Sequence, residues 1–300
     1  MKSKSLKILV TCFNRRTSTL SFFESVTRQM KQEKGYKYEI VVLDDNSPDG
    51  TARAIKDKFP EVTVLDGTGE LYWGGGMRAC YDEISAKLQS QNTYLLVCND
   101  DVSLDYNAIK RFLNFFEEII GKRGEHKETC LVGSCYDDEG NHTYGGAKLS
   151  KGLVPYFQSI TPSHNNEFIE CDTVNMNFCL LNTPACISTG FIDQIFTHGK
   201  GDFDFGLRLN KSGQNCFIAP DYYGKCSRNG NKNTSKDKHL NFLARWERLI
   251  SVKEEPFFER CTFGFRHFGL KSLVWIPLPY ISFFLNAISR TNREGDIDNG

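Results

Sequence analysis

The chain has 300 residues, and its 37 Lys and Arg residues balance 37 Asp and Glu residues. This balance gives no overall attraction to nucleic acid, so any affinity for phosphate must come from local groups. Eleven cysteines without a CxxC pair, and a start that does not resemble a secretory signal, favour free thiols in the cytoplasm. The length suits one large domain with a tail or two small ones.

The first part of the chain alternates between strand and helix patterns. Apolar runs at 6–12 and 38–43 predict buried strands, each ending in a polar cluster. Helical patterns follow at 19–34 and 49–59, and a short strand follows at 62–65. This order predicts an α/β fold whose parallel, helix-flanked sheet opens its loops on one edge.

Two adjacent carboxylates follow a third apolar run. Residues 94–98 predict a buried strand, Asn99, Asp100 and Asp101 come directly after it, and a helical pattern covers 105–120. Carboxylates at the end of such a strand suit Mg²⁺ or Mn²⁺, which are typically held by one or two carboxylates plus substrate phosphates. The alternative is a strand-to-helix turn in which Asp acts as a cap.

The loops after the first two strands add complementary chemistry at the same edge. Arg15 and Arg16 can neutralise phosphate, and Asp44 and Asp45 can accept hydrogen bonds from a base or ribose. Together with the carboxylate pair, these residues predict a pocket for a metal-bound nucleoside diphosphate.

The middle of the chain predicts a smaller antiparallel part. Within 130–172, short strand-like pieces alternate with polar turns, and 174–181 predicts another core strand. Thr183 and Pro184 predict the start of a helix, with a cap and a first-turn proline.

Four motifs occur in a characteristic order along the chain. They are Thr11-Cys12-Phe13-Asn14-Arg15, the run from Asp44 to Thr51, Asn99-Asp100-Asp101, and the run from Gly201 to Arg208. In this order they resemble the inverting family-2 glycosyltransferases with the GT-A fold, of the bacterial polysaccharide type. The resemblance covers about residues 5–230.

The resemblance implies a fold and a division of the chain. It implies a mostly parallel central sheet flanked by helices, with a small antiparallel addition and a helical C-terminal tail. Residues 1–232 would form the catalytic domain, with a nucleotide-sugar-binding half (1–125) and an acceptor-side half (126–232). Residues 233–300 would form a helical, apolar region for contact with a membrane surface or a second subunit.

The resemblance also implies a role for individual residues. Asp44 would contact the nucleotide base, Asp101 would bind the Mg²⁺ or Mn²⁺ that bridges the diphosphate, and Asp202 would be the catalytic base. The glycine-rich segment 71–78 matches a family segment near the donor. The full set of expected donor-binding residues is Thr11, Asn14, Arg15, Asp44, Asp45, Trp73, Gly75, Arg78 and Asp100.

Two members of the glycine-rich segment have other interpretations. Trp73 could stack on a base or a sugar, but a packed core tryptophan is an equal alternative. Arg78 could contact phosphate or be a solvated helix residue.

The motif at 201–208 offers two carboxylates for one catalytic role. A helix starting near Asp202 would place it in the first turn, where an anion is favoured, although it could simply be a helix cap. Asp204 and Arg208 are four residues apart, which predicts a structural ion pair. Gly201 stands where many relatives carry Glu, and Cys226 stands where many carry His. A thiolate suits Mg²⁺ poorly, so Cys226 is expected to be a small buried residue.

The predicted reaction moves a sugar from a nucleoside diphosphate sugar to a hydroxyl of a saccharide or lipid-linked saccharide, with inversion. The alternatives are a nucleotide-sugar-binding protein without turnover and a sugar-nucleotide pyrophosphorylase, although the latter would carry a glycine-rich, lysine-bearing loop after the first strand. A dehydrogenase lacks support because no GxGxxG follows that strand.

The tail at 263–285 is rich in aromatic and aliphatic residues with basic flanks. Lys271, Pro277 and Pro279 interrupt it, so it predicts a segment lying at the cytoplasmic face of the inner membrane rather than a spanning helix. The alternative is packing on its own domain or on a second subunit of a homodimer.

Overall fold

The computed structural model describes residues 4–88, 92–124 and 126–297, and the side chains as far as Ala287. Its internal contacts divide the chain into two compact units. Unit 1 consists of Met1–Leu149 and Phe157–Arg228, and unit 2 consists of Ser150–Tyr156 and Asn229–Gly300.

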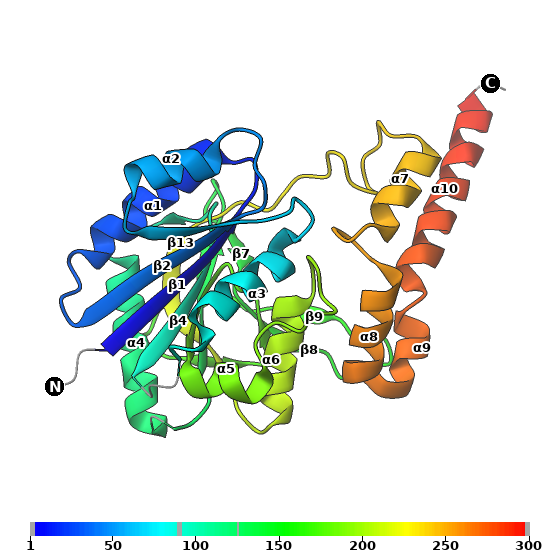
Figure 1. The fold of residues 1–300 in the computed structure, drawn as a ribbon. Coiled ribbons are helices and arrows are strands. Elements are labelled where there is room, and N and C mark those ends of the chain that lie inside the picture. The colour runs from blue at the N-terminus through cyan, green and yellow to red at the C-terminus, as the bar shows by residue number, and fades with distance from the viewer. Residues whose placement is uncertain (1–3, 89–91, 125, 298–300) are drawn as a thin grey trace. The chain divides into compact units, whose positions relative to one another are not determined.

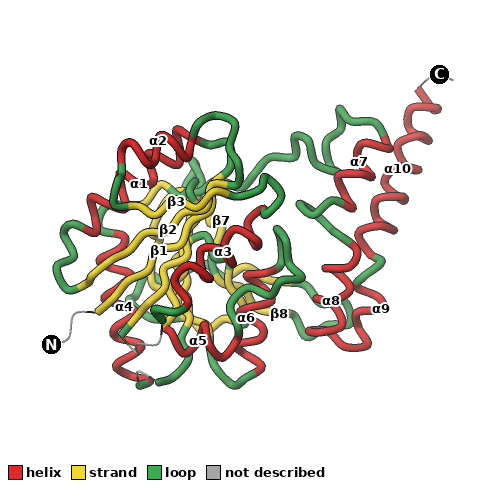
Figure 2. The backbone as a smooth tube through the Cα atoms, in the orientation of Figure 1, coloured by secondary structure: helices red, strands yellow, loops and turns green. Residues whose placement is uncertain are grey.

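Unit 1 is built around one large sheet (Figures 1 and 2). The main path of the sheet has the order β10-β13-β6-β12-β4-β1-β2-β3, and β5 and β7 pair with β13 and β6. Its strands are β1 (Lys4–Cys12), β2 (Tyr36–Asp44), β3 (Val62–Asp66), β4 (Thr93–Asn99), β5 (Ser103–Leu104), β6 (Cys130–Tyr136), β7 (His142–Tyr144), β10 (Ile169–Cys171), β12 (Phe178–Asn182) and β13 (Cys216–Lys225).

The first four long strands form the parallel half of the sheet. β2 pairs in parallel with β1 and β3, and β1 also pairs in parallel with β4. The strand order therefore reverses at β1, and open α/β sheets bind ligands at the carboxyl edge of such a switch point. β12 runs antiparallel between β4 and β6, and β13 runs parallel to β6.

Helices cover both faces of this sheet because alternate residues of each strand point to opposite sides. In β1, Ile8 packs in the same core cluster as residues of α1, α2 and α4, whereas Leu9 packs with residues of α3, α5 and α6. These helices are α1 (Arg16–Met30), α2 (Thr51–Lys58), α3 (Tyr72–Ser85), α4 (Ala108–Arg123), α5 (Thr183–Thr189) and α6 (Gly201–Lys211). The predicted α/β class and mostly parallel sheet are confirmed.

The antiparallel addition is confirmed as well. A second sheet has the order β11-β8-β9, with β11 (Thr173–Val174), β8 (Gly146–Leu149) and β9 (Phe157–Ser159). The turn between β6 and β7 is closed by Asp137, whose Oδ1 accepts hydrogen bonds from the backbone N–H groups of Glu139 and Asn141 at 3.0 and 2.8 Å.

The strand predicted at 174–181 is interrupted. β11 ends at Val174 and β12 begins at Phe178. Between them, the N–H of Asn175 donates to the carbonyl of Gly145, and the N–H of Met176 lies 3.4 Å from Asp202 Oδ2. These partners lie far away in the sequence, so the apolar pattern alone could not show the break.

Helix α5 begins at the predicted place with a different cap. The side chain of Asn182, rather than that of Thr183, accepts the hydrogen bond of the Ala185 N–H at 3.2 Å. Pro184 lies in the first turn as expected, where a missing N–H costs nothing.

Unit 2 is helical. It contains α7 (Phe242–Ile250), α8 (Phe257–Phe268), a 3-10 turn η1 (Gly269–Lys271), α9 (Ser272–Trp275) and α10 (Leu278–Ile297). Gly269, at φ 55° and ψ −130°, ends α8. Within the described residues, the stretch Phe257–Ala287 alone is long and apolar enough to cross a membrane by composition, and 22% of its most apolar window is buried.

Candidate active site

The ends of β1, β2 and β4 meet at one edge of the sheet. Cys12 pairs in register with Asp44, and Thr11 pairs with Asn99. The polar residues that follow each strand are therefore side by side, as the sequence predicted.

Arg15 joins the two carboxylates that follow β4. Its Nη2 lies 3.2 Å from Asp100 Oδ1, and its Nη1 donates to Asp101 Oδ2. Asp100 Oδ2 accepts a hydrogen bond from Thr19 Oγ1 at 2.7 Å. Asn107 occupies the N-cap position of the helix after this loop without a side-chain cap bond, so neither Asp100 nor Asp101 serves as its cap.

Asp100 is the more buried of the two carboxylates. Its exposed fraction is 1%, and its Oδ1 has no hydrogen-bond partner among the described residues. Burial raises the pKa of Asp100 to about 6, against the opposing effect of the Arg15 charge. This oxygen is therefore a buried polar atom that still lacks a full complement of partners.

Asp101 lies closer to solvent and could hold a divalent ion. Its side chain is 32% exposed, and its Oδ1 lies 3.7 Å from Cys226 Sγ. Among the described residues no three His, Cys, Asp or Glu side chains are grouped to hold a metal. A single carboxylate plus substrate phosphates is nevertheless an ordinary Mg²⁺ environment, so Asp101 fits such an ion, and the adjacent Asp100 has a buried oxygen without a hydrogen-bond partner among the described residues.

Cys226 is a buried thiol beside this carboxylate. Burial raises its pKa to about 12, and Asn177 Nδ2 lies 3.7 Å from its sulfur. A neutral thiol is a weak ligand for a hard cation, in agreement with its expected packing role.

Asp44 and Asp45 lie at the edge, but their oxygens are already bonded to the surrounding loops. Asp44 Oδ2 accepts from the Ala52 N–H at 2.9 Å. Asp45 accepts from the N–H groups of Gly69 and Tyr72 at 2.7 and 2.9 Å. Since each carboxylate oxygen has two lone pairs, both residues fix these loops and keep limited capacity for a ligand.

Thr11 and Asn14 border the same edge. Thr11 is 9% exposed, and a Cβ placed on Gly76 would lie 2.6 Å from its methyl group, so glycine is required for α3 to approach β1. Asn14 is exposed at φ 53°, and its N–H donates to Ser47 Oγ at 2.8 Å.

Trp73 is held in place rather than free to move. Its Nε1 donates to Asn99 Oδ1 at 2.9 Å, and it packs partly buried against the core. A Cβ on Gly201 would lie 3.6 Å from the Trp73 ring, so this ring borders the start of α6. These contacts agree with the packed ring, and stacking of Trp73 on a base or a sugar stays a prediction.

Arg78 points into unit 1. Its Nη1 donates to the carbonyls of Asp193 and Phe196 at 3.1 and 2.9 Å. A Cβ on the neighbouring Gly75 would lie 3.2 Å from Leu71 Cβ. These contacts tie α3 to the 193–196 loop, and a phosphate contact of Arg78 stays a prediction.

Asp202 and Asp204 lie in the first turn of α6 with different surroundings. Asp204 is fully buried and accepts a bond from Arg208 Nε at 2.7 Å, which confirms the predicted ion pair. Asp202 is half-buried, and its Oδ2 lies 3.5 Å from Asn175 Nδ2. Burial raises the pKa of Asp202, opposed by N–H groups including that of Phe203.

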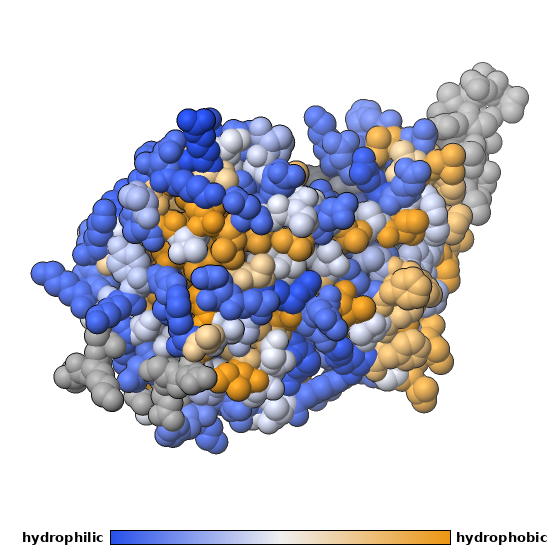
Figure 3. All heavy atoms as spheres, viewed as in Figure 1, coloured by the Kyte–Doolittle hydropathy of each residue, from blue (hydrophilic) through white to orange (hydrophobic). Residues whose placement is uncertain are grey.

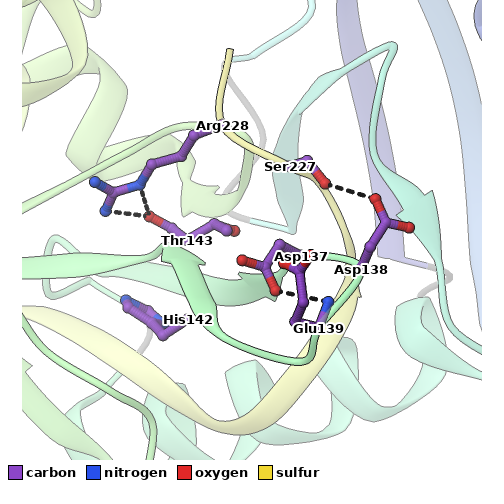
Figure 4. A pocket seen from close by; sticks show the side chains of 7 residues that line it. All are labelled: Asp137, Asp138, Glu139, His142, Thr143, Ser227 and Arg228. Carbon is purple, nitrogen blue, oxygen red and sulfur yellow. Dashed lines mark hydrogen bonds between the residues drawn. The ribbon is translucent and has the colours of Figure 1, made fainter. Parts of the chain in front are cut away.

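A pocket with a volume of about 530 Å³ lies beside this edge (Figure 4). Its lining is almost entirely polar and consists of Asp137, Asp138, Glu139, His142, Thr143, Ser227 and Arg228. Arg228 donates to the carbonyl of Thr143 through Nε and Nη2 at 3.2 and 2.8 Å.

Two chains of contacts connect the pocket to the proposed site. Ser227 directly follows Cys226, which lies beside Asp101. On the other side, a Cβ on Gly145 would lie 3.1 Å from the His142 ring of the pocket. The Gly145 carbonyl accepts a hydrogen bond from the N–H of Asn175, whose side chain lies beside Asp202. Asn99 belongs to the predicted motif but was given no role there, and neither Asn175 nor this pocket was predicted from the sequence.

Comparison with protein families identifies the part of the chain that carries this edge. Residues 7–130 match the family described as glycosyl transferase family 2. This part of the chain is therefore similar to the family 2 glycosyl transferases. A comparison with curated proteins found no match.

Solved glycosyltransferase structures share the fold at low sequence identity. TarS 1-349 from S. aureus has a TM-score of 0.50 and 13% identity, covering 89% of this chain and 72% of that one. The mannosyltransferase PcManGT from Pyrobaculum calidifontis, in complex with GDP-Man and Mn²⁺, has a TM-score of 0.53 and 10% identity, covering 95% and 73%. The GT-A fold expected from the sequence is confirmed.

Proposed function

We propose that this protein moves a sugar from a nucleoside diphosphate sugar to a saccharide or lipid-linked saccharide, with inversion. The observation that carries the proposal is the cluster of Arg15, Asp100 and Asp101 at the switch point of the sheet. It combines a cation for phosphate with carboxylates for a metal. The resemblance stated above suggests a role in bacterial surface polysaccharide assembly.

The donor would lie with its diphosphate near Asp101 and its nucleoside toward the loops after β1 and β2. Asp101 would hold Mg²⁺ or Mn²⁺ together with the diphosphate, and the ion would supply Lewis-acid stabilisation of the leaving group. Asn14 is exposed at this edge, and Asp44 and Asp45 hold the adjacent loops by hydrogen bonds to Ala52, Gly69 and Tyr72.

Arg15 would change partner on binding. In the structure its guanidinium bonds to Asp101, the carboxylate that an ion would need. An ion on Asp101 would repel the guanidinium, which would keep Asp100 as one partner and gain the donor diphosphate, to which Arg bonds well, as the other. Arg15 would therefore weaken the binding of a metal ion in the absence of the donor and strengthen the binding of the ion and the donor together.

Asp202 would remove the proton of the acceptor hydroxyl as that oxygen attacks the anomeric carbon. It is the partly exposed carboxylate in the first turn of α6, whereas Asp204 is buried in its ion pair with Arg208. A carboxylate with a raised pKa is a stronger base, provided that it is ionised at the working pH. The attack displaces the nucleoside diphosphate from the opposite side, so the configuration inverts.

The acceptor would occupy the polar pocket at the β6–β7 turn. Its carboxylates, imidazole and guanidinium suit a ligand with many hydroxyl groups. The contacts through Cys226 on one side and Asn175 on the other support a pocket next to both proposed reacting centres.

The experiment is a thermal-shift screen of the full chain against nucleoside diphosphate sugars with and without Mn²⁺. A ligand at 100 times its dissociation constant stabilises by about 2.7 kcal/mol. We expect one donor to stabilise the protein and then to be hydrolysed slowly, releasing nucleoside diphosphate. Tight binding without any release, with or without saccharide acceptors, would instead support a binding protein without turnover.

A further inference from the structure

The C-terminal stretch Phe257–Ala287 folds back on itself within unit 2. We call this stretch the helical hairpin. Arg260 is 4% exposed, its guanidinium carbon lies 3.6 Å from the centre of the Trp275 ring, and its Nε donates to the carbonyl of Ile276 at 2.8 Å. Phe263 and Phe268 also contact Trp275. The inner face of the hairpin is therefore closed by its own side chains.

The outer face of the hairpin is apolar and carries no exposed carboxylate among its described residues. Of its described side chains that are exposed, only Lys271 is charged, and its single acidic residue, Glu259, is 6% exposed. Figure 3 shows apolar surface gathered on α8, α9 and α10. The exposed large apolar residues are Phe257, Phe258, Phe265, Leu270, Leu273, Val274, Ile281, Phe284 and Leu285.

A second segment of unit 2 extends this face. Lys271 Nζ donates to the carbonyls of Lys151 and Gly152, each at 3.0 Å, and so fixes the loop Ser150–Tyr156 to the tip of the hairpin. In this loop, Leu153 is 70% exposed and Tyr156 is 60% exposed. Two segments 120 residues apart in the chain thus present apolar and aromatic side chains together with the exposed Lys151.

We infer that the helical hairpin and the loop Ser150–Tyr156 bind the surface of a membrane that contains anionic lipid. Apolar and aromatic side chains gain free energy by entering the acyl boundary, and lysines gain from the negative surface potential of the leaflet. An exposed carboxylate would oppose this attraction, and the described hairpin presents none.

The geometry favours a hairpin that lies in the interface over one that spans the bilayer. The 12 residues of α8 extend about 18 Å at the usual rise, and a spanning helix needs about 20 apolar residues. The second arm continues in α10 to Ile297, but its sequence stays apolar only as far as Ile288 and then carries Arg290, Arg293, Glu294 and Asp296. Gly269 separates the two arms, so they do not add up to one straight helix.

This inference deepens the proposed function, because a surface-bound enzyme would meet a lipid-linked acceptor. The binding itself requires neither donor nor metal. It can therefore fail while donor binding persists, and it can hold in a protein that lacks transferase activity.

The test is co-sedimentation of the full chain with vesicles of phosphatidylcholine alone and with vesicles that also contain about 30 mol% phosphatidylglycerol as the anionic lipid. Leu273→Glu is the test variant. Ile187→Glu is its matched control, because Ile187 lies on α5 of unit 1 and is exposed to the same fraction, 63%. Melting curves and nucleoside diphosphate binding check that both variants are folded.

We expect the wild type and Ile187→Glu to bind the anionic vesicles, more weakly at high salt, and Leu273→Glu to lose about 10-fold or more in partitioning. The inference is overturned if the wild type ignores both vesicle types, or if the two variants lose binding equally. The inference is also overturned if the wild type does not bind vesicles but forms a dimer that Leu273→Glu dissociates. That result would assign the face to a subunit contact.

Discussion

Asp202→Asn should separate chemistry from binding at this site. The substitution keeps the shape of the side chain but removes the charge that would accept the proton. A positioned base contributes about 10²- to 10⁴-fold in rate, which corresponds to about 2.7–5.5 kcal/mol of transition-state stabilisation. Asp202 Oδ1 accepts a hydrogen bond from the Phe203 N–H at 2.8 Å, and its Oδ2 makes long contacts with Met176 and Asn175 at 3.4 and 3.5 Å. Because the amide oxygen of asparagine can accept the same bond, the fold should lose less than about 1 kcal/mol.

The matched control is Asp204→Asn, two residues along the same helix. Asp204 is fully buried against Arg208, so this change should cost about 3–5 kcal/mol of stability by leaving the guanidinium without its charged partner. Molecules of this variant that remain folded should keep most of their turnover.

The assay measures nucleoside diphosphate release for turnover, calorimetry for donor affinity and denaturant unfolding for stability. Asp202→Asn should show near-normal affinity and stability with turnover reduced by at least about 100-fold. An active Asp202→Asn together with a folded but inactive Asp204→Asn would show that the wrong carboxylate has been chosen.

Two further predictions concern Arg15 and the carboxylates that follow β4. Arg15→Gln should raise the affinity for Mn²⁺ alone, because Arg15 would compete with the ion for Asp101. The same variant should lower the affinity for nucleoside diphosphate about 10-fold or more, because the guanidinium would assist the diphosphate. The paramagnetic resonance signal of free Mn²⁺ measures the first affinity, and a fall in both affinities would contradict the exchange of partners. Asp100 has a pKa of about 6 in the folded protein against a usual 3.8, so it contributes stability below about pH 4 that is lost as the pH rises through 6. Asp100→Asn should therefore reduce the change in the free energy of unfolding between pH 4.5 and 7 by about 2 kcal/mol. An unchanged pH dependence would contradict this cause.

The sequence was sufficient to predict the architecture of the site's edge. Apolar runs ending in polar clusters indicated β1, β2 and β4, and parallel strands necessarily bring such clusters together. The i, i+4 spacing was also enough to separate Asp204 from Asp202.

Contacts between distant segments could not be predicted in the same way. The bonds of Asp45 to Gly69 and Tyr72 depend on how the loop after β3 folds back, which no local pattern records. The break after Val174 likewise depends on the hydrogen bond from Asn175 to Gly145, which lies far from it in the sequence.

The most direct test of the central claim is calorimetric titration of the full chain with nucleoside diphosphates, with and without Mn²⁺, repeated on Asp101→Ala. The proposed site predicts binding of at least one nucleoside diphosphate that strengthens with Mn²⁺, and loss of that metal dependence in a variant that still folds. Equal affinities in the presence and absence of Mn²⁺, or an unchanged metal effect in Asp101→Ala, would contradict it.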